Sequence, residues 1–325
     1  MSELSLVSVI AVCYNHAKYV IETLDSIKDQ TYPNIELIIM DDSSKDNSVE
    51  VIQEWIDKNK YQCQFIAHKE NQGLCKTLNE ALKECTGKYF QLTACDDLLL
   101  PFKLSNQVDE IQNLDQDYGL VYSDVGIMND NSSGLKLTFY QESKYIPKSG
   151  DLYFEQARRQ FIKFVSCLCV TDYIKKIGGF DENLTFEDVD FFLRFAKEYK
   201  FKYINEVTCF WRKHESNMTN SLYTNTRYLE SRLLAYNKHV GFKNKLDDIL
   251  KPKIIKLIKL LYKQSIYVNT NFNFLNSNKS SRLLIFFYSN KLPFRIFYFV
   301  EITLNYIKNL KMCLGDISNL PPKKF

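Results

Sequence analysis

The sequence is poor in residues that break or cross-link a chain. Gly occurs 10 times and Pro 7 times among 325 residues, which excludes a collagen-like or low-complexity chain. The nine Cys form no C-x-x-C pair, and their odd number and irregular spacing argue against a zinc site and a disulfide scaffold. Scattered thiols are typical of a reducing compartment. With 45% apolar residues, the chain is expected to form one large domain with an appendage, or two domains.

Several nucleotide-binding motifs are also missing. No G-x-G-x-x-G follows the first apolar run, and no G-x-x-x-x-G-K-[ST] occurs, which argues against a Rossmann dinucleotide site and a P-loop. The segment CYNHAKYV is not a Gly-rich triphosphate loop, so a nucleotidyltransferase is not favoured. The first 15 residues lack a basic segment and a long apolar run, and we expect a first strand of a cytoplasmic protein rather than a signal peptide.

Charge is distributed unevenly along the chain. Residues 241–325 contain 15 Lys and Arg against 4 Asp and Glu, whereas residues 1–240 contain 27 against 35. A basic tail can meet nucleic acid or an anionic membrane. Its apolar content exceeds what phosphate binding needs, so we do not expect nucleic acid as a partner.

Apolar runs typical of buried strands alternate with segments of helical period. We expect strands at 7–12, 35–40, 63–67, 89–92, 119–124 and 201–204, and helices at 18–30, 47–60, 74–84, 103–113 and from about 186. The polar stretch 129–150 is expected to be a hairpin or loop. This alternation predicts a doubly wound α/β domain with a mostly parallel sheet, in which ligands bind beyond the carboxyl ends of the strands.

Two adjacent acids, Asp96 and Asp97, follow the strand expected at 89–92. Carboxylates at the end of a buried strand repel each other and lose hydration, so one of them is expected to stay protonated unless a cation binds. One or two carboxylates completed by substrate phosphates are a common site for Mg²⁺ or Mn²⁺. An isolated Asp-Asp pair also fits a solvated turn in which Asp97 caps a short helix.

Eight segments of the chain resemble, in the same order, those of the glycosyltransferases of family 2, which have the GT-A fold. They are VSVIAVCYN, QTYP, IELIIMDDSSKDNS, NQG, TACDDLLLP, GGFDE, FEDVDFFLR and WRKHESNMTN, within about residues 5–220. The resemblance implies a Rossmann-like α/β domain over 1–220, with a mixed, mostly parallel sheet and flanking helices. Residues 1–100 would bind the nucleotide-sugar and residues 101–220 the acceptor, followed by a helical region at 221–325.

The resemblance also implies residues that bind the donor. Asp42 would accept a hydrogen bond from the nucleobase, and a carboxylate can accept the ring N–H of uracil, thymine or guanine alike. Tyr14 would stack on the base, although it also fits a core aromatic at a strand end. Asn71 and Lys76 would meet the ribose or diphosphate, and Lys76 also fits a solvated helix position. Arg212 would neutralise phosphate.

The acids 96 and 97 resemble the second half of the family's metal-binding motif, in which one acid meets the ribose and the other the metal. The chain departs from the commoner pattern because Ala94 stands where many members carry a further Asp. Mn²⁺ or Mg²⁺ would then be held by Asp96 or Asp97 and by diphosphate oxygens. His214 would complete the metal site as neutral imidazole or meet the diphosphate when protonated.

Asp188 resembles the family's catalytic base. An inverting transfer is a single displacement in which one carboxylate takes the proton of the attacking hydroxyl. Glu187 and Asp190 compete for this assignment, because both lie at the same expected helix start. As i,i+3 neighbours they could both face away from Asp188. Acids also favour a helix start for structural reasons alone.

The region after residue 225 is expected to be helical at 226–238 and 251–267, the latter with lysines on one side. The apolar runs 283–288 and 296–300 are each too short to span a bilayer. Peripheral membrane contact through 251–300 is expected, with packing on the catalytic domain or on a second subunit as the alternative.

The resemblance and the tail together predict a cytoplasmic, membrane-peripheral, inverting enzyme. It would move a sugar from a nucleoside-diphosphate sugar, with a UDP-sugar favoured, to a glycan or glycolipid hydroxyl in bacterial surface polysaccharide synthesis. The alternative is a non-catalytic nucleotide-sugar-binding or scaffold protein on the same fold. A homodimer is left open.

Overall fold

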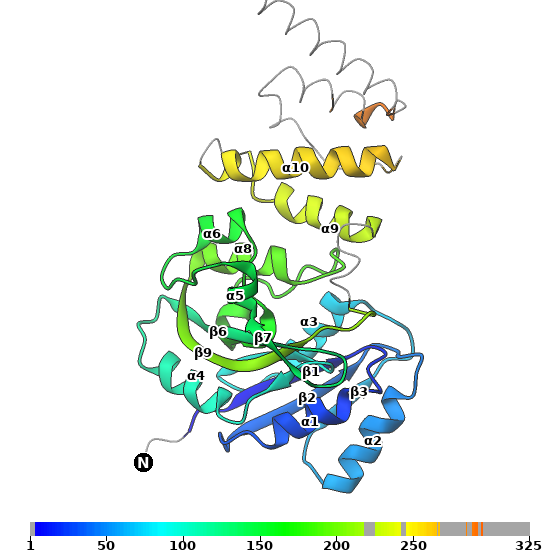
Figure 1. Ribbon diagram of the computed structural model, residues 1–325, viewed down its shortest axis with the longest axis vertical. Coiled ribbons are helices and arrows are strands. Elements are labelled where there is room, and N and C mark those ends of the chain that lie inside the picture. Colours follow the sequence, from blue (N-terminus) through cyan, green and yellow to red (C-terminus); the bar gives the residue numbers. More distant parts are fainter. Residues whose placement is uncertain are drawn as a thin grey trace, which may run out of the picture. The chain divides into compact units, whose positions relative to one another are not determined.

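The computed structural model describes residues 4–217, 225–241, 245–264, 266, 284, 288–291 and 294. The chain divides into two compact units, residues 1–222 and 223–325. Figure 1 shows the sheet of the first unit with helices on its faces. Because all strands of the described residues lie within 7–212, this unit contains the whole sheet that positions the candidate site.

The first half of the sheet is parallel. Its strands pair in the order β3-β2-β1-β4, with Val7 opposite Ile35 and Tyr89 in the two pairs that β1 makes. Their bounds are β1 Val7–Cys13, β2 Ile35–Asp41, β3 Gln64–Ala67 and β4 Tyr89–Ala94. β1 and β4 are buried along almost their whole length, as expected of strands covered on both faces, and the segments after their carboxyl ends meet at one edge of the sheet.

Helices cover both faces of this half, as the alternation in sequence predicts. They are α1 Val20–Lys28, α2 Ser48–Asn59 and α3 Leu74–Glu84. Alternate residues of β1, including Val7, Val9 and Ala11, pack in one core with apolar side chains of α1 and α2. Since successive side chains of a strand point to opposite faces, the residues between them face the other layer.

The second half of the sheet is mixed. Its order continues β4-β8-β6-β9-β5, with β8 antiparallel to both of its neighbours and β6 parallel to β9. The strands are β5 Leu98–Leu99, β6 Tyr118–Met128, β7 Gly134–Thr138, β8 Cys167–Val170 and β9 Lys200–Arg212, and β7 pairs with β6. The helices are α4 Lys103–Gln112, α5 Phe139–Ser143, α6 Tyr153–Arg158, the 3-10 turn η1 Phe164–Ser166, α7 Thr171–Lys176 and α8 Asp188–Glu198.

The last strand is longer than the sequence predicts. The strand expected at 201–204 continues to Arg212, because β9 pairs with β6 over its whole length with shifts of register on the way. A Cβ on Gly126 of β6 would lie 2.5 Å from the Phe210 ring, so only glycine fits this crossing without movement. The longer strand carries Arg212 directly to the edge where β4 ends.

The second unit contains α9 Thr226–Asn237 and α10 Lys245–Lys263, which contact each other. The helix expected at 251–267 therefore begins six residues earlier. The sequence predicts membrane contact in this region. Several apolar side chains of α10, such as those of Ile254, Ile258 and Leu261, are instead buried within the protein. Most of 283–288 and all of 296–300 lie outside the described residues.

Two absences hold for the part of the chain that the structure describes. No helix there has the length and apolar character needed to cross a membrane. The eight cysteines within it, which are all except Cys313, are free thiols.

Candidate functional site

The Asp42 carboxylate closes the turn that leads into α3. Its Oδ1 accepts the backbone N–H of Gln72 at 2.7 Å, and its Oδ2 accepts that of Gly73 at 2.9 Å. His68 Nδ1 lies 2.9 Å from Oδ1, and the Asn71 side chain donates to the Asp42 carbonyl at 2.9 Å. The carboxylate that is predicted to accept a hydrogen bond from the nucleobase thus binds the protein's own backbone, while its Oδ2, which has one donor, can accept a further hydrogen bond.

Two of the predicted donor-binding residues are exposed. Tyr14, directly after β1, is 43% exposed, so its ring is not part of the core. Lys76 is exposed on α3 and donates to Gln72 Oε1 at 2.5 Å. Both side chains lie where a ligand can reach them.

Asp96 and Asp97 are buried directly after β4. His214 Nε2 lies 2.9 Å from Asp96 Oδ2, and His16 Nε2 lies 3.7 Å from the same oxygen. Burial disfavours the charge on Asp96, but the two imidazoles outweigh it and lower the pKa of this carboxyl. Burial and the neighbouring charge of Asp96 raise the pKa of Asp97 well above its usual value. The two acids therefore differ in their readiness to ionise.

Arg212, at the end of β9, is fully buried and its guanidinium has several partners. Nε donates to the Asp96 carbonyl at 2.8 Å, Nη1 to Ser132 Oγ at 2.8 Å, and Nη2 to Glu22 at 2.9 Å. Its guanidinium carbon lies 4.7 Å from the centre of the Tyr19 ring. The side chain predicted to meet phosphate thus fastens β9 to the acid pair and to α1.

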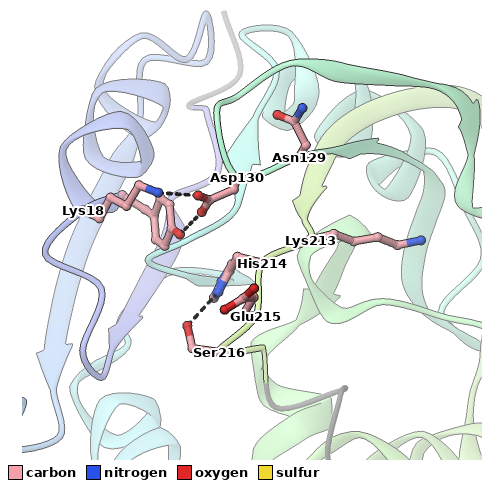
Figure 2. A pocket seen from close by; sticks show the side chains of 8 residues that line it. Lys18, Asn129, Asp130, Lys213, His214, Glu215 and Ser216 are labelled. Atoms are coloured by element: carbon pink, nitrogen blue, oxygen red, sulfur yellow. Dashed lines mark hydrogen bonds and ion pairs between the residues drawn. The ribbon is translucent and has the colours of Figure 1, made fainter.

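An open pocket of about 740 Å³ lies beside His214. Figure 2 shows Lys18 donating to Asp130 across its wall, at 2.5 Å, and His214 Nδ1 beside Ser216 Oγ, at 2.8 Å. Of the residues singled out in the sequence, only His214 lines it; the others that do are Lys18, Tyr19, Asn129, Asp130, Lys213, Glu215 and Ser216. His214 thus connects this pocket with Asp96.

A second group of acids stands at the start of α8. Glu187 precedes the helix and Asp188 is its first residue, and both are partly buried. Burial and the charge of Asp188 raise the pKa of Glu187 to about 8. Asp97, Glu187 and Asp188 all act on the ammonium of Lys163, whose pKa is nevertheless lowered by burial. Acids from the end of β4 and from the start of α8 therefore share one cationic neighbour.

Asp190 has a different environment. It is 1% exposed, and its Oδ2 accepts a hydrogen bond from Arg194 Nε at 2.7 Å. The same guanidinium donates to the carbonyls of Ile177 and Gly179, at 2.7 Å each. Asp190 thus holds α8 to the turn before it.

The residues after β4 do not form a complete metal site by themselves. They fit a cation that binds together with a phosphate ligand. Within the described residues, no three His, Cys, Asp or Glu side chains are arranged to hold a metal ion. The hydrogen bond that Asp97 accepts is from the backbone N–H of Arg212, at 3.1 Å. A buried acid with a raised pKa gains from a nearby cation, and Mg²⁺ and Mn²⁺ are held by few carboxylates when phosphates supply the remaining ligands.

Sequence reasoning missed two members of this site. Lys163 stands in an apolar, Cys-rich run that signals only a buried strand, and nothing in the sequence relates it to acids 66 and 25 residues away. His16 follows the first strand, as the functional residues of parallel sheets do, and that position was its only signal.

The architecture is that of GT-A glycosyltransferases. A mannosyltransferase from Pyrobaculum calidifontis in complex with GDP-Man and Mn²⁺ is similar with a TM-score of 0.57 and 18% identity, over 79% of this chain and 71% of that one. Residues 1–349 of S. aureus TarS in complex with UDP-GlcNAc are similar with a TM-score of 0.55 and 18% identity, over 86% and 78%. At this identity the likeness shows the fold.

The chain belongs to glycosyl transferase family 2, whose sequence profile matches residues 8–171. An uncharacterized glycosyltransferase of Rickettsia typhi is 32% identical over 217 residues, which are 66% of each chain. One of Methanocaldococcus jannaschii is 30% identical over 210 residues, 64% of this chain and 70% of that one. The match spans just under two thirds of the Rickettsia typhi relative and 31% of one from Rickettsia felis.

Proposed function

We propose that the protein is an inverting glycosyltransferase that transfers a sugar from a nucleoside-diphosphate sugar to a hydroxyl of a glycan or glycolipid. The observation that carries the proposal is that the charges of Asp97, Glu187 and Asp188 all act on the ammonium of Lys163. A single displacement requires that acids near the donor diphosphate and an acid near the reacting hydroxyl lie around one site. Asp97 comes from the segment after β4, whereas Glu187 and Asp188 come from the start of α8.

In this proposal Asp188 is the general base. It accepts the proton of the acceptor hydroxyl while the hydroxyl oxygen forms a bond to the anomeric carbon and the bond from that carbon to the diphosphate oxygen breaks. Asp188 is favoured over Glu187 because a base must be ionised, and the pKa of Glu187 is raised to about 8. Asp190 is not favoured, since Arg194 occupies its carboxylate.

Asp42 and Tyr14 would bind the nucleobase of the donor, and Asn71 and Lys76 would bind its ribose or diphosphate. Tyr14 is exposed and able to stack, and Asp42 holds the turn that carries Asn71. We favour a UDP-sugar, although the similar solved structures include complexes with both UDP-GlcNAc and GDP-Man.

Asp96 and Asp97, with His214, would hold Mn²⁺ or Mg²⁺ together with diphosphate oxygens. Such an ion supplies charge that stabilises the leaving diphosphate. His214 is placed to take part because its Nε2 already lies 2.9 Å from Asp96 Oδ2. Arg212 would act indirectly, through its hydrogen bond to the Asp96 carbonyl.

We further propose that the enzyme acts in bacterial surface polysaccharide synthesis from the cytoplasmic face of the membrane, which it meets through residues 251–300. Exposed lysines of α10, including Lys256 and Lys263, support this contact. The apolar residues of α10 do not, because most of them are buried.

A second candidate function is nucleotide-sugar binding without transfer. It is favoured by Ala94 in place of a third acid and by the full engagement of Arg212 with other protein groups. Such a protein would bind a donor but would not release its sugar.

Replacement of Asp188 distinguishes the two. Binding is measured first, by thermal shift with UDP-, GDP- and dTDP-sugars with and without Mn²⁺, because a ligand present at 100 times its Kd stabilises the folded state by about 2.7 kcal/mol. With the best donor, we expect Asp188→Asn to reduce sugar release about 10²- to 10⁴-fold while the thermal shift is kept.

Glu187→Gln is the matched control and should retain more activity than Asp188→Asn. Equal activity of Asp188→Asn and wild type would contradict the base assignment. Donor binding without any sugar release by the wild type would favour the second candidate.

A further inference from the structure

His68 follows β3 directly and lies beside the carboxylate that closes the turn before α3. Its backbone N–H donates to the Asp41 carbonyl at 2.9 Å, which fixes the residue to the end of β2. Its side chain is 8% exposed and lies between two carboxylates: Nδ1 is 2.9 Å from Asp42 Oδ1, and Nε2 is 3.2 Å from Glu80 Oε2. Because an ionised carboxylate only accepts hydrogen bonds, Nδ1 carries a proton and donates it to Asp42.

This contact completes the hydrogen bonds of one of the two Asp42 oxygens. Among the described residues, Oδ1 accepts the backbone N–H of Gln72 at 2.7 Å as well as His68 Nδ1, whereas Oδ2 accepts only the backbone N–H of Gly73, at 2.9 Å. A carboxylate oxygen accepts about two hydrogen bonds, one for each lone pair. Oδ1 is therefore saturated by the protein, and Oδ2 can accept one more donor.

The nucleobases differ in how many donors they present to a carboxylate. Uracil and thymine have one ring N–H between two carbonyl groups. Guanine has a ring N–H and an exocyclic amino group side by side, and a carboxylate accepts both of them only with both of its oxygens. On Asp42 the ring N–H of guanine would meet Oδ2, while its amino group would meet an oxygen without a remaining lone pair. A donor that loses water and gains no partner weakens binding.

We propose that His68 is a specificity-determining residue for the nucleobase: by occupying Asp42 Oδ1, it restricts the donor to bases with a single ring N–H, uracil or thymine. The inference rests on the proposed function, because it requires that Asp42 meets the base. The neighbouring Asp41 cannot take this role, since it is fully buried and both of its oxygens accept hydrogen bonds from Ser44. Glu80 supports the assignment, because its contact with Nε2 holds the ring with Nδ1 towards Asp42.

Burial makes the selection effective. The Asp42 side chain is itself only 8% exposed, so water has little access to a base donor that is left without a partner there. A polar group in such a place is not compensated by solvent, in contrast to one at an exposed carboxylate. The preference should therefore depend on the number of donors that the base presents, and not on the size of its ring system.

The first test uses the unchanged protein and two purine nucleotides. Inosine diphosphate (IDP) lacks the exocyclic amino group of GDP and is otherwise the same molecule, so it presents a single ring N–H. In calorimetric titrations of the full chain with Mn²⁺ present, IDP should bind about 10-fold more tightly than GDP, because GDP has one donor without a partner. Equal Kd values for IDP and GDP would overturn the inference even if UDP binds more tightly than both, because that preference would reflect ring size.

The second test changes His68. His68→Leu frees Asp42 Oδ1 for a second donor, so the preference for IDP should disappear and GDP should bind at least as tightly as IDP. His68→Asn is the matched control, because an asparagine amide nitrogen can take the place of imidazole Nδ1 and donate to Asp42, and it should keep the preference. A His68→Leu variant that still binds IDP about 10-fold more tightly than GDP overturns the inference. If this variant does not fold, as judged by its Tm without nucleotide, the wild-type ratio decides.

The outcomes separate this inference from the proposed function. A wild type that binds UDP, IDP and GDP but releases sugar from no sugar nucleotide contradicts the proposed function, while the ratio of Kd values still tests His68. A wild type that releases sugar but binds IDP and GDP equally overturns the inference alone. A wild type that binds none of the three nucleotides with Mn²⁺ contradicts the proposed donor site, and the inference with it.

Discussion

Lys103 is a fully buried amine, and no carboxylate of the described residues pairs with it. Its Nζ donates to Gln91 Oε1 at 2.5 Å and also to Gln107 Oε1, and the Cys167 carbonyl lies 3.4 Å away. Burial lowers its pKa to about 8 from the usual 10.5. Because the acceptors are neutral, they satisfy the hydrogen bonds of the ammonium without balancing its charge.

This environment predicts a pH dependence of stability. Between pH 8 and 10.5 the unfolded chain keeps the proton that folded Lys103 has released, so the unfolded state binds more protons and stability at this site rises with pH, by on the order of 3 kcal/mol. We expect Lys103→Met to lose this rise. The measurement is the free energy of unfolding in urea at pH 7.5, 9 and 10.5 for both proteins.

Only the difference between the two pH profiles is informative, because tyrosines and other lysines titrate in the same range. Lys103→Met also leaves two buried glutamine oxygens without a donor, which lowers stability by a similar amount at each pH. Lys83→Met is the control and should follow the wild-type profile. Parallel profiles of Lys103→Met and wild type would show that folded Lys103 keeps an ordinary pKa near 10.5, and therefore keeps its proton over this range.

For single residues, the sequence predicted which side chains follow strand ends better than it predicted which side chains contact each other. Asp96, Asp97 and Tyr14 lie after strand ends, as expected, because the end of an apolar run is a local property. The partners of Arg212 could not be predicted, since Glu22 and Ser132 are 190 and 80 residues away. Their meeting depends on which strands pair.

At the scale of elements, the turn before α3 depends on one carboxylate. Gly73 has φ +87°, which L side chains rarely adopt, and its N–H and that of Gln72 both donate to Asp42. The helix follows with buried residues Cys75, Leu78 and Leu82 at helical spacing, which explains why its predicted bounds are correct. Asp42, directly after β2, thus holds the end of that strand to the start of this helix.

We therefore expect Asp42→Ala to destabilise the protein without nucleotide by about 2–3 kcal/mol, because two backbone donors lose a charged acceptor. Asp42→Asn keeps one oxygen and should lose less. The free energy of unfolding in urea, measured without nucleotide, tests this. If Asp42→Ala unfolds like wild type and loses only donor binding, the carboxylate serves the ligand and does not maintain the turn.

The parallel half of the sheet was predictable, whereas the mixed half was not. β1 and β2 were expected within one residue of their observed ends, since uninterrupted apolar runs mark strands that are covered on both faces. An apolar, Cys-rich run marks the short strand β8, but nothing local indicates that it lies antiparallel between β4 and β6. The length of β9 was underestimated because the polar pair Asn205-Glu206 interrupts its apolar residues.

At the scale of the whole chain, the apolar and the charged residues of the second unit have different roles. Apolar residues of α10 are used inside the protein, so they cannot also enter a bilayer. Lys256 and Lys263 are exposed and seven residues apart, and hence on one side of the helix. Membrane contact in the described part of this unit would therefore be electrostatic and confined to the surface.

Such contact should depend on lipid charge and on salt. The full chain should sediment with vesicles of 30% phosphatidylserine in phosphatidylcholine and not with phosphatidylcholine alone, and 0.5 M salt should release it, because exposed charges are screened. Each lysine near an anionic surface contributes about 1 kcal/mol. Reversing two charges in Lys256→Glu/Lys263→Glu should thus weaken partition at least about 10-fold, whereas Lys83→Glu/Lys176→Glu, the same change in the first unit, should not. Equal binding of both double variants would exclude this face of α10, and binding to phosphatidylcholine alone that resists salt would indicate apolar insertion by another segment.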